Sequence, residues 1–224
     1  MKWFFILAGI YFSLNANAQV LYDTLPNLPE RYAVRFEKFK KEPVVLGKVM
    51  FLGDDVIEAG NWRKLLKDST AINRGISGDN TFGVLHRLDE IAKRKPSRIF
   101  LLIGVNDLSK NIPNEVIIEN IFAIVGKIRG ASPKTKIFLQ SLLPLNPGIK
   151  DFPANLAKQE NIREINGQLK KYGDVFKFTY VDIYNQFLDK QNALDARFTY
   201  DGLHLNAVGY IRWVSYLKKS AYLL

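Results

Sequence analysis

The sequence predicts an α/β fold in which helices cover both faces of a parallel sheet. Five short apolar runs alternate along the chain with segments of helical periodicity, a pattern typical of successive β-α-β units. The first run, residues 49–52, is continuously apolar, as strands buried on both faces are. Glycines and polar side chains follow them, and the carboxyl ends of parallel strands are where such folds collect function.

The elements follow one another in a regular order. The predicted strands are residues 49–52, 71–73, 98–103, 136–142 and 176–183. The predicted helices are residues 29–41, 61–66, 81–92, 115–128, 157–172 and 206–222. Helix 115–128 has the clearest apolar stripe, with Ile117, Ile121 and Ile124 at helical spacing.

The composition narrows the class of protein. A chain of 224 residues with 47% apolar residues folds around its own core, and its length indicates one domain. The absence of cysteine excludes disulfides, a thiolate nucleophile and cysteine zinc sites. With two histidines, a multi-histidine metal centre is disfavoured, and neither metal nor cofactor is expected. The net charge of +10 by itself suggests nucleic acid as a partner.

The first eighteen residues have the pattern of a secretory signal. A positive start at Lys2 precedes an apolar run over residues 3–12, and small residues end at Ala18. The run is shorter than the roughly 20 residues of a transmembrane helix, so cleavage after Ala18 is favoured over an anchor. A domain over residues 19–224 would then begin with an extension, 19–47, that contains one helix.

Export changes the interpretation of the charge. Removing residues 1–18 takes away one lysine and no acid, which lowers the net charge from +10 to +9. An exported protein, periplasmic or extracellular, seldom meets nucleic acid. We therefore expect no nucleic-acid partner, and attribute the charge to envelope surfaces, anionic glycans or solubility.

Several loop residues are candidates for chemistry. Asp201 stands three residues before His204, so its carboxylate can accept a bond from the imidazole and orient the ring. Asn106 follows Gly104 and can aim an amide donor at the same edge, as stabilisation of an oxyanion requires. Gly78 can expose a backbone N–H. Each feature alone also fits an ordinary loop, but their order and placement together favour a site.

The chain resembles the SGNH, or GDSL-type, ester hydrolase family in four ordered blocks between residues 49 and 210. Residues 51–58 (FLGDDVIE) resemble the family block GDSxxE, and residues 73–81 (NRGISGDNT) resemble the second block. Residues 104–107 (GVND) fit the G-x-N-D block, and Asp201-x-x-His204 fits D-x-x-H. The resemblance implies a flavodoxin-like three-layer α/β/α sandwich with a five-stranded parallel sheet, usually metal-independent.

The resemblance also assigns roles to five positions. It places the nucleophilic serine at position 55, where this chain has Asp55, with His204 removing the serine proton and Asp201 orienting His204. Asn106 and the backbone N–H groups of residues 55 and 78, the latter Gly78, hold the oxyanion. The implied substrate is a small-molecule or glycan acyl ester, with a short-chain or acetyl group.

Asp55 departs from the family pattern, because an aspartate in place of serine removes the hydroxyl. Two carboxylates near His204, those of Asp55 and Asp201, favour its imidazolium form, which cannot act as a general base. The Asp55 carboxylate can also occupy the oxyanion hole and exclude a substrate carbonyl. Titration of His204 by NMR tests the first of these hypotheses, since an imidazole that loses its proton as readily as a free one would contradict it.

No other residue is an evident substitute for the serine. Ser77 and Ser109 fit structural places beside their motifs, and His86 is expected on a helix, partly exposed. Attack by Asp55 itself would create an anhydride. Two hypotheses remain open: an esterase that retains some activity, and an impaired relative that binds a carbohydrate or acyl ligand. A nucleotide-binding module ranks below both, because the chain has no glycine-rich phosphate loop.

Overall fold

The computed structural model describes residues 28–156 and 158–223. In this part of the chain, five parallel strands form one sheet in the order β2-β1-β3-β4-β5. The strands are β1 (Val49–Gly53), β2 (Ile72–Gly75), β3 (Arg98–Leu102), β4 (Lys136–Gln140) and β5 (Thr179–Val181). The predicted α/β fold with a five-stranded parallel sheet is confirmed. The predicted signal, residues 1–18, lies outside the described residues.

The helices of the described residues connect the strands. They are α1 (Glu30–Lys41), α2 (Asp55–Ala59), α3 (Trp62–Leu66), α4 (Thr81–His86), α5 (Leu88–Ala92), α6 (Val105–Ser109), α7 (Asn114–Ala131), α8 (Gln159–Lys171), α9 (Gly173–Phe176) and α10 (Ala207–Lys219). Short 3₁₀ helices lie at Ala154–Leu156 and Tyr184–Gln186. None of these helices has the length and hydrophobicity to cross a membrane.

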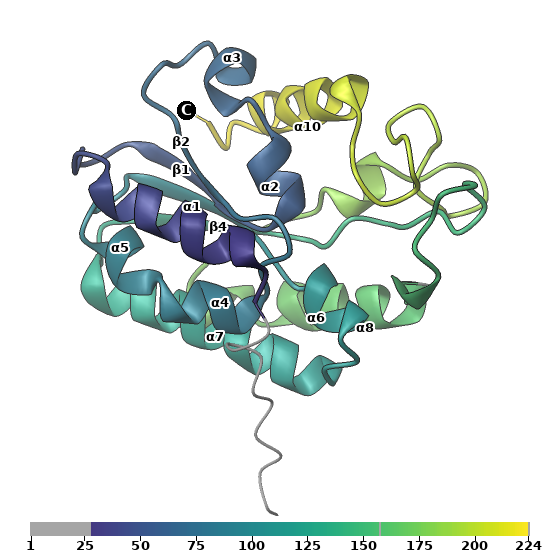
Figure 1. Cartoon of the computed structure of the whole chain (residues 1–224), viewed down its shortest axis with the longest axis horizontal. Helices are drawn as coiled ribbons and strands as arrows, with labels where there is room; N and C mark the ends of the chain where they lie inside the picture. Colours follow the sequence, from purple (N-terminus) through teal and green to yellow (C-terminus); the bar gives the residue numbers. More distant parts are fainter. Residues whose placement is uncertain (1–27, 157, 224) are drawn as a thin grey trace, which may run out of the picture.

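Side-chain alternation along the strands gives the sheet two different apolar faces. One face packs against α4, α5, α7 and α8 through aliphatic side chains such as Met50, Ile99 and Leu139. The other packs against α2, α3 and α10 through aromatic rings. There Phe51 stacks on Phe100 at 4.9 Å and on Trp62 at 3.8 Å, measured between ring centroids. The result is a three-layer sandwich (Figure 1).

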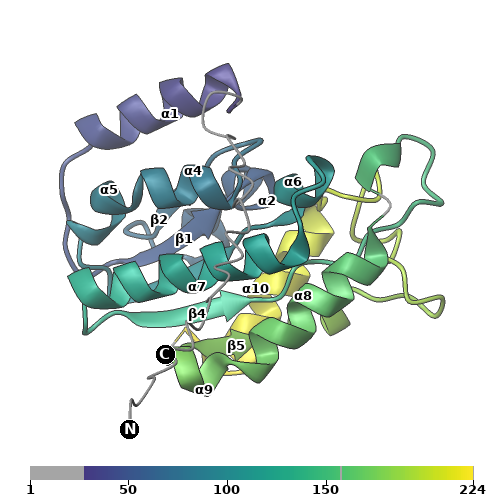
Figure 2. The ribbon, with the colours of Figure 1, turned by 90° about the horizontal axis from the view of Figure 1, so that it is seen from below.

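Helix α1 lies outside these layers, beyond α4 and α5 (Figure 2). Its buried residues Tyr32 and Phe39 form a small apolar cluster with Ile76. The Tyr32 hydroxyl donates to the Gly83 carbonyl of α4 at 2.8 Å. Helix α1 is therefore packed against the sandwich through a small core of its own, beside the edge strand β2.

Most predicted elements differ from the structure by one to three residues at their ends, and two differ more. The helix expected over residues 81–92 is divided at Arg87 into α4 and α5. The buried Arg87 guanidinium donates to the Asp79 carboxylate and to the Gly53 carbonyl. The strand expected over 176–183 was wrong at its start. Phe176 ends α9 and stacks on Phe122 at 4.0 Å, and Lys177 then turns through the left-handed region before β5 begins.

Candidate active site

Asp55 begins helix α2 directly after β1, and its carboxylate is the centre of the carboxyl-edge site. One oxygen, Oδ2, accepts from the Gly78 backbone N–H at 2.9 Å and from the Asn106 amide at 2.7 Å. The other, Oδ1, accepts from the Ser77 hydroxyl at 2.5 Å. Burial opposes the charged form, but these three bonds outweigh it and hold the pKa of Asp55 below its usual range.

The loop after β2 presents two of these donors. Gly78 has φ of +76°, in the left-handed region that favours glycine, and a Cβ there would lie 2.5 Å from the Pro29 ring. Glu58, on α2, accepts from the Ser77 backbone N–H at 2.6 Å and also pairs with Arg31 of α1. The loop is therefore fixed from both sides, by Asp55 and by Glu58.

Asn106 lies in the first turn of α6, after β3. Its side-chain amide donates to Asp55 and also to the Asp79 backbone carbonyl at 2.9 Å, so both of its hydrogens are used. The neighbouring Asp107 points inward and accepts from the backbone N–H and hydroxyl of Thr81. These bonds tie the loop after β3 to the start of α4, and so fix the direction of the Asn106 amide.

Asp201 and His204 come from the loop before α10. The imidazole Nδ1 lies 2.6 Å from Asp201 Oδ2, while Asp201 Oδ1 accepts from the His204 backbone N–H at 2.7 Å. Burial again opposes ionisation, but the bonds from His204 lower the pKa of Asp201. The Tyr200 ring stacks on the imidazole at 5.9 Å. The ring is thereby oriented with Nε2 toward Asp55.

Asp55 and His204 approach each other without a direct hydrogen bond. His204 Nε2 is 4.0 Å from Asp55 Oδ1, and the side chains are 29% and 20% exposed respectively. That distance exceeds hydrogen-bond range, so neither residue holds the other in place. The imidazolium form expected for His204 stays a prediction.

Three further aspartates lie buried behind Asp55. Burial raises the pKa of Asp107 to about 7, and that of Asp79 to about 6 despite its pair with Arg87 at 2.8 Å. Burial also raises the pKa of Asp54 well above its usual range, and its Oδ2 has no hydrogen-bond partner among the described residues. The acids behind the site therefore retain protons that exposed carboxyls would lose.

The structure brings the five predicted site residues to one edge of the sheet. Asp55 contacts Gly78 and Asn106, and faces His204, which pairs with Asp201. Their catalytic roles stay predictions. Within the described residues, no group of three or more His, Asp or Glu side chains is placed to hold a metal ion.

The sequence alone gave no role to three residues that shape this edge. Ser77 was interpreted as structural, yet its hydroxyl bonds Asp55. Glu58 lies in the first motif and fixes the loop, and Tyr200 stacks on His204. Their places inside or beside motif blocks were the available signal. By contrast, His86 is exposed on α4 against Tyr32, and the Ser109 hydroxyl bonds the Asn106 carbonyl.

A His–Asp pair facing two N–H donors at the carboxyl edge of a parallel sheet is an arrangement suited to acyl transfer. The model of the GDSL-like lipase/acylhydrolase family matches residues 53–212. The chain therefore belongs to this family. It is 32% identical over 178 residues to platelet-activating factor acetylhydrolase IB subunit alpha2 of Rattus norvegicus, covering 77% of this chain and 73% of that protein.

Solved structures give the same fold. A chain from Streptococcus pneumonia whose description names platelet activating factor superposes with a TM-score of 0.77 at 28% identity, covering 91% of this chain and 97% of that one. A GDSL-like lipase from Bacteroides thetaiotaomicron superposes with a TM-score of 0.70 at 22% identity, covering 86% and 98%. An acetyl xylan esterase superposes with a TM-score of 0.64 at 19% identity, covering 77% of this chain and 98% of that one.

Proposed function

We propose that this acylhydrolase-family protein binds a short-chain acyl ester in the carboxyl-edge site and that Asp55 suppresses its hydrolysis. The observation that carries the proposal is the position of Asp55 Oδ2, which takes both the Gly78 N–H and the Asn106 amide. These are two of the three donors that the family resemblance assigns to the oxyanion of a tetrahedral intermediate. An ester carbonyl cannot use them while the carboxylate stays in place.

The position of His204 supports the same proposal. With serine at position 55, His204 would take the hydroxyl proton, and Asp201 would stabilise the imidazolium that forms. With aspartate there is no hydroxyl to activate. Attack by the Asp55 carboxylate would form an anhydride, and the attacking oxygens would first have to leave the bonds to Ser77, Gly78 and Asn106.

A second candidate function, slow hydrolysis by water, is favoured by the retained Asp201–His204 pair. In that reaction a water between His204 Nε2 and the bound ester gives its proton to the imidazole as its oxygen attacks the carbonyl. The alkoxide leaving group then takes the proton from His204. The occupied donors give the intermediate little stabilisation, so this route is slow.

The ligand class follows from the family and its relatives. A relative is named as an acetylhydrolase of platelet-activating factor, and a structural neighbour is an acetyl xylan esterase. We therefore propose a small-molecule or glycan ester carrying an acetyl or other short acyl group. We also propose that the protein is exported, which the signal-like residues 1–18 support. N-terminal sequencing of the mature protein tests export, and a chain that keeps Met1 would contradict cleavage after Ala18.

The test is an esterase assay with an aryl acetate on the natural chain and on Asp55→Ser. Because serine restores the nucleophile and frees the donors, kcat/KM should rise by about three orders of magnitude or more. Asp55→Asn is the matched control, since it removes the charge without supplying a nucleophile, and it should stay inactive.

A further substitution separates the two functions. If the natural chain hydrolyses the ester slowly by the water route, His204→Ala abolishes that turnover. If the natural chain only binds the ester, there is no turnover to lose and the assay gives the same result for both. Equal activity in the natural chain and in Asp55→Ser would overturn the proposal that Asp55 suppresses hydrolysis.

A further inference from the structure

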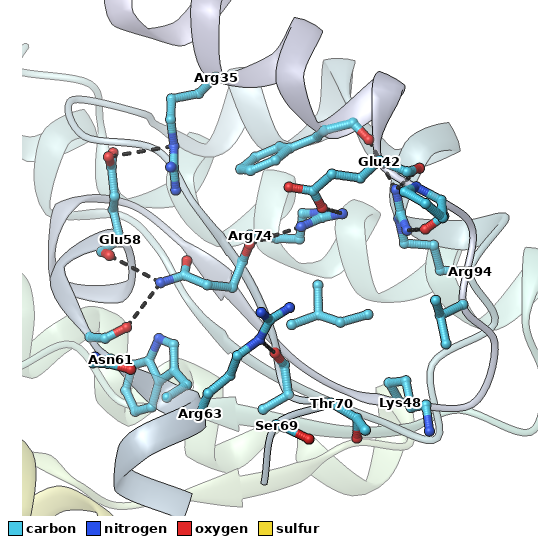
Figure 3. A pocket seen from close by; sticks show the side chains of 18 of the residues that line it. Arg35, Glu42, Lys48, Glu58, Asn61, Arg63, Ser69, Thr70, Arg74 and Arg94 are labelled. Carbon is cyan, nitrogen blue, oxygen red and sulfur yellow. Dashed lines mark hydrogen bonds and ion pairs between the residues drawn. The ribbon is translucent and has the colours of Figure 1, made fainter.

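A cavity of about 810 Å³ lies along the outer edge of β2, apart from the candidate active site (Figure 3). Its walls come from the end of α1, from the turn between α2 and α3, and from the residues that lead into β1 and β2. The candidate active-site residues Asp55 and His204 do not line it. The volume is in the range of small-molecule sites.

The deep wall of the cavity, called its floor below, is a buried network of ion pairs in which the arginine charges are already compensated by carboxylates. Arg74 and Arg94 are each 2% exposed, and both pair with the buried carboxylate of Glu90. Arg74 also pairs with Glu42 at 2.7 Å, and Arg94 donates to the Pro43 carbonyl. These arginines are fixed in position by bonds to protein groups, so they form a rigid floor.

Two cations on the outer wall have no such partner. Arg63 Nε donates to the Ala71 carbonyl at 3.1 Å, which holds the stem and leaves the terminal nitrogens without a partner among the described residues. Lys48 forms no ion pair within the described residues. It lowers the pKa of Asp68, but that carboxylate lies outside the lining and already accepts from the hydroxyl of Thr70.

The outer wall with Arg63 and Lys48 faces residues at the α1 side of the cavity. Figure 3 shows Arg63, Ser69, Thr70 and Lys48 along one side, and Arg35 with Glu42 along the other. Arg35 Nε has no hydrogen-bond partner among the described residues, although it lies 3.4 Å from Glu58.

The lining as a whole is cationic. It contains the five cations Arg35, Lys48, Arg63, Arg74 and Arg94 and the two acids Glu42 and Glu58. With Glu90 behind the floor counted as a third acid, the balance stays positive. A positively charged recess of this size favours an anion over a neutral ligand.

We propose that the cavity is a second binding site, for a small organic anion whose carboxylate or phosphate oxygens bond Arg63 and Lys48. Guanidinium groups bind such oxygens in pairs, and an ammonium adds a point charge. The rigid floor of Arg74 and Arg94 supplies a positive potential behind the bound anion without moving. The site requires no turnover at Asp55, so it stands independently of the esterase proposal.

The experiment is an NMR titration of the ¹⁵N-labelled protein at constant ionic strength, with sodium glucuronate in one arm and inorganic phosphate in the other. Saturable shifts are expected at the backbone amides of Lys48 and of residues 69–71. Arg63→Gln and Lys48→Gln should each weaken binding about tenfold, since each removes a charge-assisted bond. Lys127→Gln, an exposed lysine on α7, is the matched control and should bind as the natural protein does.

The two arms distinguish the chemistry of the ligand. Saturation by glucuronate alone assigns the site to carboxylates, and saturation by phosphate alone assigns it to phosphorylated ligands. Either result supports the proposal. Failure of both probes to saturate, or equal dissociation constants for the natural protein and the Arg63→Gln and Lys48→Gln variants, would overturn it. The esterase assay of Asp55→Ser is unaffected by that outcome.

Discussion

The carboxyl edge of the sheet and the outer edge of β2 hold their charged side chains in opposite ways. At the carboxyl edge, Asp55 is held by neutral donors: a hydroxyl, an amide and a backbone N–H. At the β2 edge, buried arginines are held by carboxylates in direct ion pairs, with Glu90 between Arg74 and Arg94.

The difference predicts that the carboxyl edge tolerates substitution of its charged residue, whereas the β2 edge does not. Neutral donors lose a bond when their acceptor changes, but they leave no uncompensated charge behind. Paired ions are interdependent, because removal of one leaves the other buried and charged. The residue at position 55 can therefore differ from the family's serine while the fold persists, whereas the network at β2 tolerates little change.

The largest effect is expected from Glu90→Gln. The substitution leaves Arg94 buried without a carboxylate and Arg74 with Glu42 alone, so the free energy of unfolding should fall by about 3–5 kcal/mol. Urea denaturation measures it. Glu37→Gln, which breaks the exposed pair with Lys40, should change stability by less than about 0.5 kcal/mol. Similar losses in both variants would mean that the β2 network is not interdependent.

An intermediate effect is expected from Asn106→Ala in the Asp55→Ser background. Removing one oxyanion donor should lower kcat by about 10²–10³, because the negative charge of the transition state then loses one hydrogen bond. The assay is the aryl acetate reaction, with Lys127→Ala as control. A change confined to KM would show that Asn106 binds the ester without stabilising the transition state.

The smallest effect is a pH dependence. Asp107, with a pKa of about 7 in the fold against 3.8 as its ordinary value, keeps its proton to higher pH when folded than when unfolded. The free energy of unfolding therefore falls as pH rises from about 4 to about 7, by roughly 2–4 kcal/mol from this group.

Asp107→Asn should remove that slope. Relative to the natural chain, the variant should gain stability between pH 4 and pH 8, as measured by urea denaturation at each pH. The exposed Asp174→Asn on α9 is the control and should follow the natural chain. A variant with an unchanged slope would assign the pH dependence to other groups, such as Asp79.

Much of the fold was predictable because its strands are buried on both faces. Short apolar runs alternating with helical segments located all five strands, and the stripe on α7 identified the longest helix. The break at Arg87 was not predictable, because the helical pattern continues through it. It depends on a bond from Arg87 to Asp79 and to the Gly53 carbonyl, 34 positions away in the chain.

The site was predictable as a set of motifs, and its arrangement was not. The motifs give Asp55, Gly78, Asn106, Asp201 and His204 in order along the chain. They do not give the acceptor roles of the two Asp55 oxygens, or the 4.0 Å between Asp55 and His204. Those depend on where four separate loops end.

The sequence by itself determined the class of fold, the family motifs and the aspartate at position 55, since local patterns and residue identities encode all three. Only the tertiary structure decided that the Asp55 carboxylate accepts from the Gly78 N–H and the Asn106 amide, and that Arg63 and Lys48 line a recess without an ion pair among the described residues. The physical reason is the same in both places. Hydrogen bonds and charge balance depend on distances between loops remote in the chain, which only the packing of helices on the sheet fixes.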